Sequence, residues 1–504
     1  MRRRRTTITA KPTTTSPAME HIDPGGRERE TVIMFVDIMG ASEVSNHKSP
    51  KDYATFVNKF QKLFMDVCKR YTDAWYEPGE REQLQFSARG DEGLLMIYRP
   101  ETLTDPTVDI DVAINIALEL KRKWLCSEIN AKERIDSGLL PIDLAIGIHI
   151  GRTYLERMPA SKPKPEGNPG GWLPEGYAIN LAKRVESHSR QGRFSHILLS
   201  EAAEGQLNYL TNERTYLFDN PQVVSPKGIS RDIRVYEIKH HFLPSDWTEE
   251  SEQSRRSKTL LDPTSVNIEV VKKALAMNPT NLWLSEEFIR SSMLQNYNNL
   301  LDEERDDPVK RSIAFKEARD KATFLSQGDQ RDAGVLFIQG LVEGECSNYE
   351  GERRLYDDAI YYREQLAEAY WYKGQSFSMQ IYDELEGDSK KPLSKLPAKL
   401  QALVPQAISN LRQAKSMRSQ AAWMLFDYAC EVIRWAEDDQ APEIPEAIND
   451  IVAACHALDE VKEKLNKEPY LERVHSHPTI KKLLADEHRP DSSDVQSEMG
   501  QQIQ

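Results

Sequence analysis

Long apolar segments, paired cysteines and an excess of positive charge are all missing from this chain of 504 residues. No apolar run approaches the roughly 20 residues that a membrane-spanning helix needs. The formal net charge is −14 at pH 7, whereas broad binding to nucleic acid or to anionic membranes favours a basic surface. We therefore expect a protein that neither inserts into a membrane nor binds nucleic acid.

The cysteines are few and scattered. There are five, none of them in a Cys-x-x-Cys pair, which fits reduced thiols and gives no metal-site spacing. The Arg run at residues 2–5 is followed by a polar, Thr-rich stretch without the apolar segment of an export signal. These features predict a cytoplasmic protein.

Length and composition predict two or three domains. Between Thr31 and Phe242, strand-like apolar runs alternate with helical patterns, which predicts an α+β domain. Beyond a charged linker the strand signal ends, and amphipathic patterns with recurring Ala, Leu and aromatic residues indicate an all-α, tetratricopeptide-like array. The expected segments are a disordered tail (1–29), the α+β domain (30–242), a linker (243–264), the helical domain (265–488) and a second disordered tail (489–504).

The α+β domain can be divided into elements by its periodicity. The expected strands are the apolar runs 31–36, 83–88, 93–98, 142–150, 195–200 and 233–239. The expected helices are the amphipathic runs 51–71, 108–128 and 177–190. Pro, Gly and Lys crowd the segment 159–174, which predicts an exposed loop there.

Two aspartates stand where strands are expected to end. Asp37 closes the apolar run 32–36, and Asp91 follows Gly90 between two further apolar stretches. Carboxylates at the ends of neighbouring strands can hold two divalent cations at the spacing that phosphoryl transfer uses. Either aspartate alone is more often a structural turn residue, but the two together favour a metal site.

A second pattern lies on the expected helix 177–190. Asn180 and Arg184 are four residues apart and share one helix face, where an amide and a guanidinium suit a ribose and a developing phosphate charge. An exposed polar face is the ordinary alternative. Lys227, beside Gly228, can reach a phosphate but also fits a surface turn. We interpret His149, in a buried-looking strand, as a packing residue.

Taken in order, these features resemble the catalytic domain of class III nucleotidyl cyclases. No block is specific alone, whereas the ordered set is. The one change is Ile179, where the family has Val before the helix Asn. The blocks are a strand Asp followed by Gly and Ser (37–42), a hairpin Gly-Asp (90–91), Gly-Ile-x-x-Gly on a strand (147–151), the helix motif (176–184) and a late Lys-Gly (227–228).

The resemblance implies a ferredoxin-like catalytic domain with a two-metal mechanism. In this family one subunit supplies the metal carboxylates and the other supplies Asn and Arg, so the resemblance also implies a homodimer with two equivalent sites. The implied roles are Asp37 and Asp91 for two Mn²⁺ or Mg²⁺ ions, the backbone of Ile38, Met39 and Gly40 and the side chain of Lys227 for the phosphates, Asn180 for the ribose, and Arg184 for charge at the α-phosphate.

The base-reading positions depart from the family's purine enzymes. Ser87 stands where adenylate cyclases place a Lys, and Leu173 stands where they place an Asp or Thr; guanylate cyclases would use an acidic residue and a Cys or similar polar residue. An apolar Leu cannot discriminate between bases by hydrogen bonding. Arg89, in Arg-Gly-Asp-Glu, adds a resemblance to the pyrimidine cyclases of the Pycsar antiphage systems, which make cyclic UMP or cyclic CMP for a separate effector.

We therefore expect a uridylate cyclase that converts UTP to 3′,5′-cyclic UMP and diphosphate, with CTP as the second candidate substrate. Its product would activate an effector in antiviral defence. An adenylate or guanylate cyclase with an atypical base pocket is one alternative. An inactive cyclase-like domain that carries a helical protein-binding scaffold is another, although degenerate domains usually lose at least one of the four carboxylate, amide and guanidinium residues.

Overall fold

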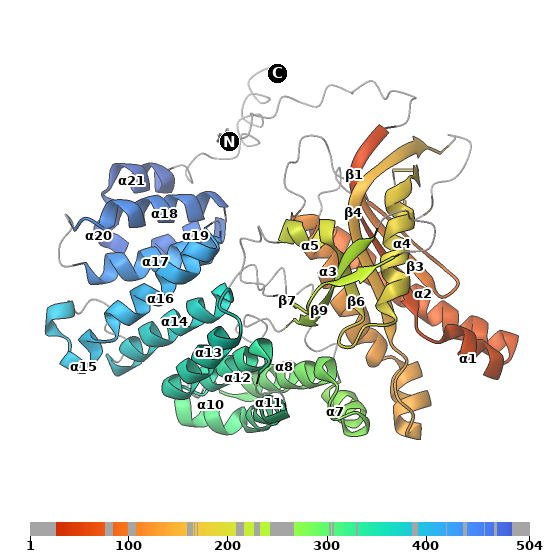
Figure 1. Cartoon of the computed structure of the whole chain (residues 1–504), viewed down its shortest axis with the longest axis horizontal. Coiled ribbons are helices and arrows are strands. Elements are labelled where there is room, and N and C mark those ends of the chain that lie inside the picture. Colours follow the sequence, from red (N-terminus) through yellow and green to blue (C-terminus); the bar gives the residue numbers. More distant parts are fainter. Residues whose placement is uncertain are drawn as a thin grey trace, which may run out of the picture.

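The chain contains the two parts that its sequence predicts (Figure 1). Strands with flanking helices lie between Arg27 and His241, and the described part of 267–485 contains helices and no strand. The predicted fold class, an α+β domain followed by an all-α array, is confirmed. The computed structural model describes residues 27–75, 84–98, 107–158, 165, 167–168, 170–207, 216–225, 232–241, 267–301, 304, 307–328, 331–385, 392–419, 421–436, 441–457, 459–467 and 471–485.

A nine-stranded sheet forms the centre of the described α+β domain. Its path is β2–β3–β1–β4–β6–β9–β7, with β5 paired to β4 and β8 paired to β9. Strand β1 pairs antiparallel with both β3 and β4, while β4 and β6 run parallel. The strands are β1 (Arg27–Ile38), β2 (Leu84–Arg89), β3 (Glu92–Tyr98), β4 (Leu144–Arg157), β5 (Trp172–Glu175), β6 (Ile197–Ser200), β7 (Leu217–Phe218), β8 (Gln222–Val224) and β9 (Ile233–His240).

Alternation along β1 divides its side chains between two helical layers. Met34 and Val36 pack in the apolar core with α2 and α3, whereas Ile33 and Phe35 pack with α4 on the other face of the sheet. Asp37 continues the second series, so its carboxylate emerges on the α4 face. The flanking helices are α1 (Ala41–His47), α2 (Pro50–Trp75), α3 (Thr107–Leu125), α4 (Tyr177–Ser189) and α5 (Glu201–Leu207).

The observed strands extend beyond the expected ones. Strand β4 continues to Arg157, past its expected end at 150, and β5, β7 and β8 match no expected strand. Strand β1 begins at Arg27, inside the segment 1–29 that was expected to be a tail, because residues 27–30 pair with the far end of β4. The prediction of a loop over all of 159–174 is wrong at its end, where β5 pairs with β4. Asn168 organises this return, because its amide donates to the carbonyl of Trp172 at 2.7 Å and its carbonyl accepts from the N–H of Trp172 at 3.0 Å.

The helical domain is an array in which successive helices pack side by side (Figure 1). Its two largest apolar cores among the described residues are centred on α12 and on α17. No described helix is both long and apolar enough to cross a lipid bilayer. The helices are α7 (Ile268–Met277), α8 (Leu282–Asn299), α10 (Pro308–Ala314), α11 (Lys316–Gly328), α12 (Ala333–Glu345), α13 (Tyr349–Tyr362), α14 (Ala367–Glu384), α15 (Ala398–Gln401), α16 (Val404–Met417), α17 (Ala422–Trp435), α18 (Ile444–Ala457), α19 (Asp459–Lys467), α20 (Glu472–His475) and α21 (Pro478–Ala485).

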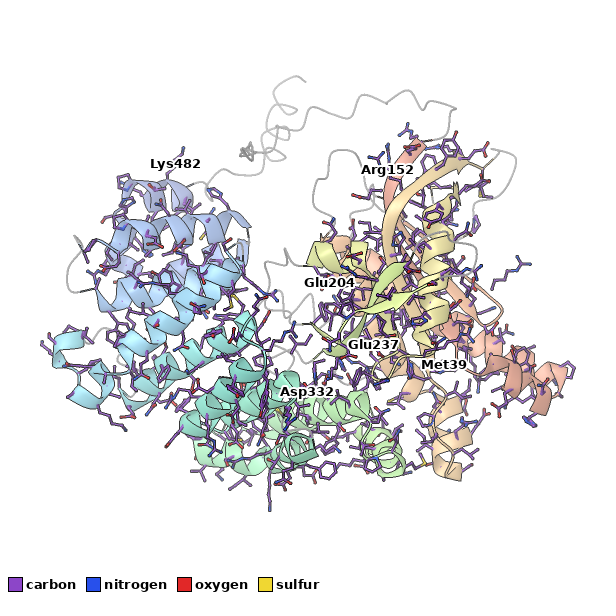
Figure 2. The ribbon with its side chains drawn as sticks, in the orientation of Figure 1. Met39, Arg152, Glu204, Glu237, Asp332 and Lys482 are labelled. Carbon is purple, nitrogen blue, oxygen red and sulfur yellow. The ribbon has the colours of Figure 1, made fainter. Side chains whose placement is uncertain are left out.

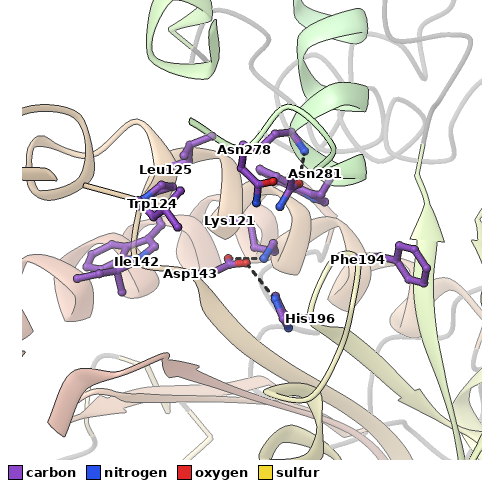
Figure 3. Close-up of a pocket in the computed structure, with 13 residues that line it drawn as sticks. Lys121, Trp124, Leu125, Ile142, Asp143, Phe194, His196, Asn278 and Asn281 are labelled. Carbon is purple, nitrogen blue, oxygen red and sulfur yellow. Dashed lines mark hydrogen bonds and ion pairs between the residues drawn. The ribbon is translucent and has the colours of Figure 1, made fainter. Parts of the chain in front are cut away.

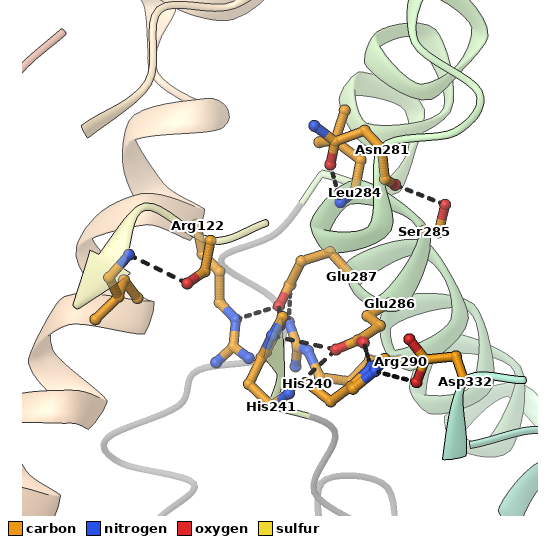
Figure 4. A network of polar contacts seen from close by, with 12 residues as sticks. Arg122, His240, His241, Asn281, Leu284, Ser285, Glu286, Glu287, Arg290 and Asp332 are labelled. Carbon is orange, nitrogen blue, oxygen red and sulfur yellow. Dashed lines mark hydrogen bonds and ion pairs between the residues drawn. The ribbon is translucent and has the colours of Figure 1, made fainter. Parts of the chain in front are cut away.

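A buried ionic network joins the two domains (Figure 4). The carboxylate of Glu287, on α8, accepts hydrogen bonds from Arg122 of α3 at 2.8 Å and from Arg290 at 2.9 Å, and it lies 2.9 Å from a ring nitrogen of His241. Arg122, Glu287 and Arg290 are each at most 2% exposed. Since each buried charge depends on its partners, α8 is held firmly against α3 and the end of β9.

His240 extends this network towards α12. Its two ring nitrogens contact the carboxylates of Glu286 and Asp332, the latter at 3.3 Å. Burial by itself lowers the pKa of His240, but the charge of Glu286 and hydrogen bonds to Asp332 and Glu286 outweigh burial and raise the pKa to about 9. The imidazolium is therefore the form that fits between the two carboxylates.

The network predicts a large cost for removing its central carboxylate. Glu287→Ala removes the carboxylate that both Arg122 and Arg290 contact in a buried place, so we expect the free energy of unfolding to fall by about 3–5 kcal/mol. Urea unfolding followed by tryptophan fluorescence measures this. Glu269→Ala, an exposed carboxylate on α7, is the matched control and should change stability by less than about 0.5 kcal/mol. An equally small effect of Glu287→Ala would contradict the described network.

His240 predicts a dependence of stability on pH. Because its folded-state pKa of about 9 lies above the ordinary value of 6.5, its contribution is fully present below pH 6.5 and is lost as pH rises through 9. The free energy of unfolding should therefore decline between pH 6.5 and 9. His240→Gln should flatten this decline, whereas His47→Gln, at an exposed site on α1, should retain it.

Candidate active site

Helix α4 lies against β4 at a distance that only glycine permits. A Cβ atom on Gly147 would lie 2.1 Å from the backbone nitrogen of Glu186, and one on Gly151 would lie 2.9 Å from the Cβ of Ala178. The glycines of the strand motif 147–151 therefore have a packing role. They set the distance between α4 and the sheet, and this distance determines where the side chains of α4 that face Asp37 lie.

Asp37 is nearly buried and lies beside two cations, Lys183 of α4 and Arg190, which directly follows α4. Its side chain is 10% exposed; Oδ2 is ion-paired with Arg190 and lies 3.8 Å from Nζ of Lys183. Its other oxygen, Oδ1, is buried and has no hydrogen-bond partner among the described residues. Burial and then the charge of Glu186 raise the pKa of Asp37 to about 6, although Arg190 and Lys183 act in the opposite direction.

Asp91 lies next to Asp37 at the β2–β3 hairpin. Its carbonyl accepts from the N–H of Ile38 at 3.2 Å, and its charge is one of the causes of the raised pKa of Asp37. Its carboxylate makes no hydrogen bond or ion pair with the rest of the described chain, and it is half-buried. The sheet therefore brings the two predicted metal ligands together.

Asp37 and Asp91 provide some, but not all, of the ligands that a divalent cation needs. No three His, Cys, Asp or Glu side chains in the described residues are arranged to hold a metal by themselves. Asp37 does have an unsatisfied buried oxygen. The half-buried carboxylate of Asp91 makes no hydrogen bond or ion pair with the described residues. Mg²⁺ is commonly held by one or two carboxylates and completed by substrate phosphates and water. This donor set suits a cation that binds together with a phosphate-bearing substrate.

The backbone after Asp37 is already hydrogen-bonded. The N–H of Ile38 donates to Asp91, and the N–H of Met39 donates to the carbonyl of Asp143 at 3.0 Å. These two groups cannot bind phosphate in this geometry. Gly40 adopts a left-handed conformation with φ 72° just before α1, and it is exposed, so the expected phosphate contact is restricted to Gly40 and the residues after it.

Asn180 and Arg184 do not face the aspartates. Both side chains are exposed, and neither makes a hydrogen bond or ion pair with the described part of the chain. The buried face of α4 carries Leu181 and Val185 instead, which turns Asn180 and Arg184 towards solvent. Within one subunit, these two pairs of predicted site residues stay apart.

The candidate base-reading residues separate into two places. Ser87 is exposed on β2, and the register puts Ser87, Leu94 and Phe35 in one row across three strands, next to Asp37. Arg89 is exposed on the same strand. Leu173 is 42% exposed on β5 opposite Glu156, whereas Asp37 is opposite Ala145. At the rise of a strand, Leu173 is roughly 36 Å further along β4. Lys227 lies outside the described residues.

Sequence reasoning missed the charged residues that surround Asp37. Lys183 contacts Glu92 and lies 2.7 Å from Glu186, and Arg190 lies 3.4 Å from Glu186. The spacing of three and four between positions 183, 186 and 190 puts them on one side of a helix. Nothing in the spacing says that this side faces Asp37. We call Asp37, Glu92, Lys183, Glu186 and Arg190 the α4 ion cluster.

The loop after α4 is held by a buried glutamate on β9. Figure 2 labels this residue, Glu237. Its carboxylate accepts from the N–H groups of Arg193, Phe194 and His196, each at 2.9 Å. Glu237 is 1% exposed. A carboxylate that accepts three backbone N–H groups fixes the backbone that follows Arg190, and so fixes where this end of α4 meets β1.

A pocket of about 190 Å³ lies at the domain junction and not at the aspartates (Figure 3). Its polar side is formed by Lys121, whose ammonium is ion-paired with Asp143, and by His196, 3.8 Å from the other oxygen of Asp143. Trp283, at the start of α8, lies under Lys121 with 5.1 Å between Nζ and the ring centroid. Asp143, whose carbonyl accepts the hydrogen bond from the N–H of Met39, therefore lines the pocket. Neither Asp37 nor Asp91 lines it.

Comparisons with known proteins give partial similarities. No protein-family model and no curated protein matches this sequence. Among solved structures, the adenylyl cyclase CyaB from P. aeruginosa is similar at 16% identity and a TM-score of 0.33, over 43% of this chain and 96% of that one. The guanylyl cyclase Cya2 has 18% identity and a TM-score of 0.30, over 42% and 92%. The MamA protein has 15% identity and a TM-score of 0.25, over 43% and 91%. Scores and identities this low establish no activity.

The close approach of α4 predicts a sharp response to one methyl group. Gly147→Ala places a Cβ against the backbone of Glu186, so we expect it to lower the free energy of unfolding by about 3 kcal/mol. Gly205→Ala, in α5, meets no atom within 4 Å and is the matched control. It should leave stability unchanged or raise it by up to about 1 kcal/mol, because Ala favours helix. Equal effects of the two substitutions in thermal unfolding would contradict the described packing.

Proposed function

We propose that this chain is a nucleotidyl cyclase, which converts a nucleoside triphosphate into a 3′,5′-cyclic nucleotide and diphosphate. The observation that carries the proposal is the meeting of Asp37 and Asp91 at the hairpin edge of the sheet, beside an exposed surface on β2. Divalent cations held there would supply charge neutralisation for the triphosphate and acidify the ribose 3′-OH. The ordered motifs in the sequence support the same reaction.

The exposed positions of Asn180 and Arg184 favour a site shared between two subunits. In a homodimer, Asn180 of one subunit would orient the ribose bound by the other, and Arg184 would stabilise charge on the α-phosphate as the bond to diphosphate breaks. Leu173 precedes α4 and would come from the same subunit as Asn180. Gly40 and Lys227 would bind phosphate oxygens on the subunit that carries the aspartates or across the interface.

A pyrimidine triphosphate is the proposed substrate, with UTP before CTP. The support is chemical: Ser87 and Leu173 offer little to pair with a purine edge, and Arg89 is exposed on the same strand as Ser87. The proposed role is antiviral signalling, in which cyclic UMP or cyclic CMP activates a separate effector. The helical array would carry the sensing or assembly function of the chain.

A product assay tests the proposal. The purified full chain is incubated with Mn²⁺ and each of the four nucleoside triphosphates in turn, and cyclic products are quantified by mass spectrometry. Cyclic UMP should dominate, and Asp91→Ala should reduce it at least about 100-fold because one cation loses its ligand. Asp73→Ala, at an exposed residue of α2, is the control and should keep full activity.

The outcomes separate the competing hypotheses. Cyclic AMP or cyclic GMP as the main product would retain the cyclase and overturn the pyrimidine specificity. An Asp91→Ala variant with full activity would overturn the metal assignment. A folded dimer that makes no cyclic product from any of the four triphosphates would favour an inactive cyclase-like domain.

A further inference from the structure

Lys183 of α4 and Arg190, which directly follows α4, occupy the position next to Asp37 that a metal ion would approach. Arg190 is ion-paired with Oδ2 of Asp37, and the ammonium of Lys183 lies 3.8 Å from the same oxygen. Both cations also contact Glu186, which is fully buried, and Lys183 contacts Glu92. Asp37 therefore has internal counter-ions.

These counter-ions are partly exposed and have other partners. The side chain of Arg190 is 43% exposed and that of Lys183 is 32% exposed, whereas Asp37 is 10% exposed. Arg190 keeps a second carboxylate partner, Glu186 at 3.4 Å, and Lys183 keeps two, Glu92 and Glu186. If a cation reached Asp37, both side chains could turn to these partners or to water without becoming unpaired in a buried place.

The net charge near the two aspartates is balanced by one divalent cation. Four carboxylates, those of the α4 ion cluster and of Asp91, face two cationic side chains, which leaves two negative charges. One divalent ion balances this charge. A second ion would make the site positive until the negative charge of a triphosphate arrived.

We propose that Lys183 and Arg190 are competing counter-ions, which lower the affinity of Asp37 for divalent metal in the free protein and couple full metal loading to triphosphate binding. This inference rests on the proposed metal-binding role of Asp37. It assigns the setting of metal affinity to Arg190, which lies outside the sequence motifs, and to Lys183, at a variable position within the helix motif. Arg190 is the stronger competitor because it contacts the carboxylate directly.

Mn²⁺ binding to the full chain without nucleotide tests this inference. The free Mn²⁺ signal in electron paramagnetic resonance gives the dissociation constant independently of any activity. Arg190→Gln should lower that constant about tenfold, since a unit charge close to the ligand is removed. Arg190→Lys should change it less. Arg193 is an exposed arginine three residues further on and is the matched control. Arg193→Gln also removes one positive charge, but from a residue that does not contact Asp37, so the dissociation constant should stay within about twofold of that of the parent chain.

Two further variants keep the test decisive. Asp37→Asn should abolish Mn²⁺ binding. Lys183→Gln should strengthen Mn²⁺ binding, and it replaces Arg190→Gln in the test if Arg190→Gln does not yield folded protein. An unchanged constant in folded Arg190→Gln, or unchanged binding in Asp37→Asn, would overturn the proposal. If the constants shift as expected while no cyclic product forms, the counter-ion role stands and the cyclase function fails. The two proposals are therefore distinguishable.

Discussion

The balance of charge around one nearly buried carboxylate governs the architecture of the candidate site. Asp37 leaves the central strand on the face that α4 covers, and α4 can come close enough to reach it only because Gly147 has no side chain. Arg190 is ion-paired with this carboxylate, and Lys183 lies close to it. These two cations are also paired with Glu186 and Glu92. The hairpin with Asp91, the position of α4 and the loop held by Glu237 are all arranged around this contact.

The same principle operates at the domain junction with a different result. Around Glu287 and His240 the charged side chains are buried or nearly so and are paired across the two domains, so they hold α8 against α3 and β9. Around Asp37 the cations are partly exposed and have alternative partners. A buried ionic contact of the first kind favours rigidity. One of the second kind suits a place where an ion is to enter.

The sequence predicted those elements that have a strong local signal. The apolar run before Asp37 was sufficient to place the centre of β1, and the amphipathic pattern around Asn180 placed α4 to within one residue. The short strand β5 was missed, since its pairing depends on the distant end of β4 and on Asn168. The roles of Lys183 and Arg190 were missed for the same reason: their side of α4 becomes meaningful only after Gly147 fixes the helix on the sheet. The contact of Met39 with Asp143 likewise has no local signal.

A crystal structure of the full chain with Mn²⁺ and 3′-deoxy-UTP, which lacks the attacking hydroxyl, would test directly whether Asp37 and Asp91 bind the metal in a site shared between two copies of the chain. We expect anomalous manganese density between Asp37 and Asp91, with Arg190 turned away from Asp37 and with Asn180 and Arg184 from a second copy of the chain beside the nucleotide. Manganese bound elsewhere, or a nucleotide at Asp37 with Asn180 and Arg184 of both copies left in solvent, would contradict this expectation.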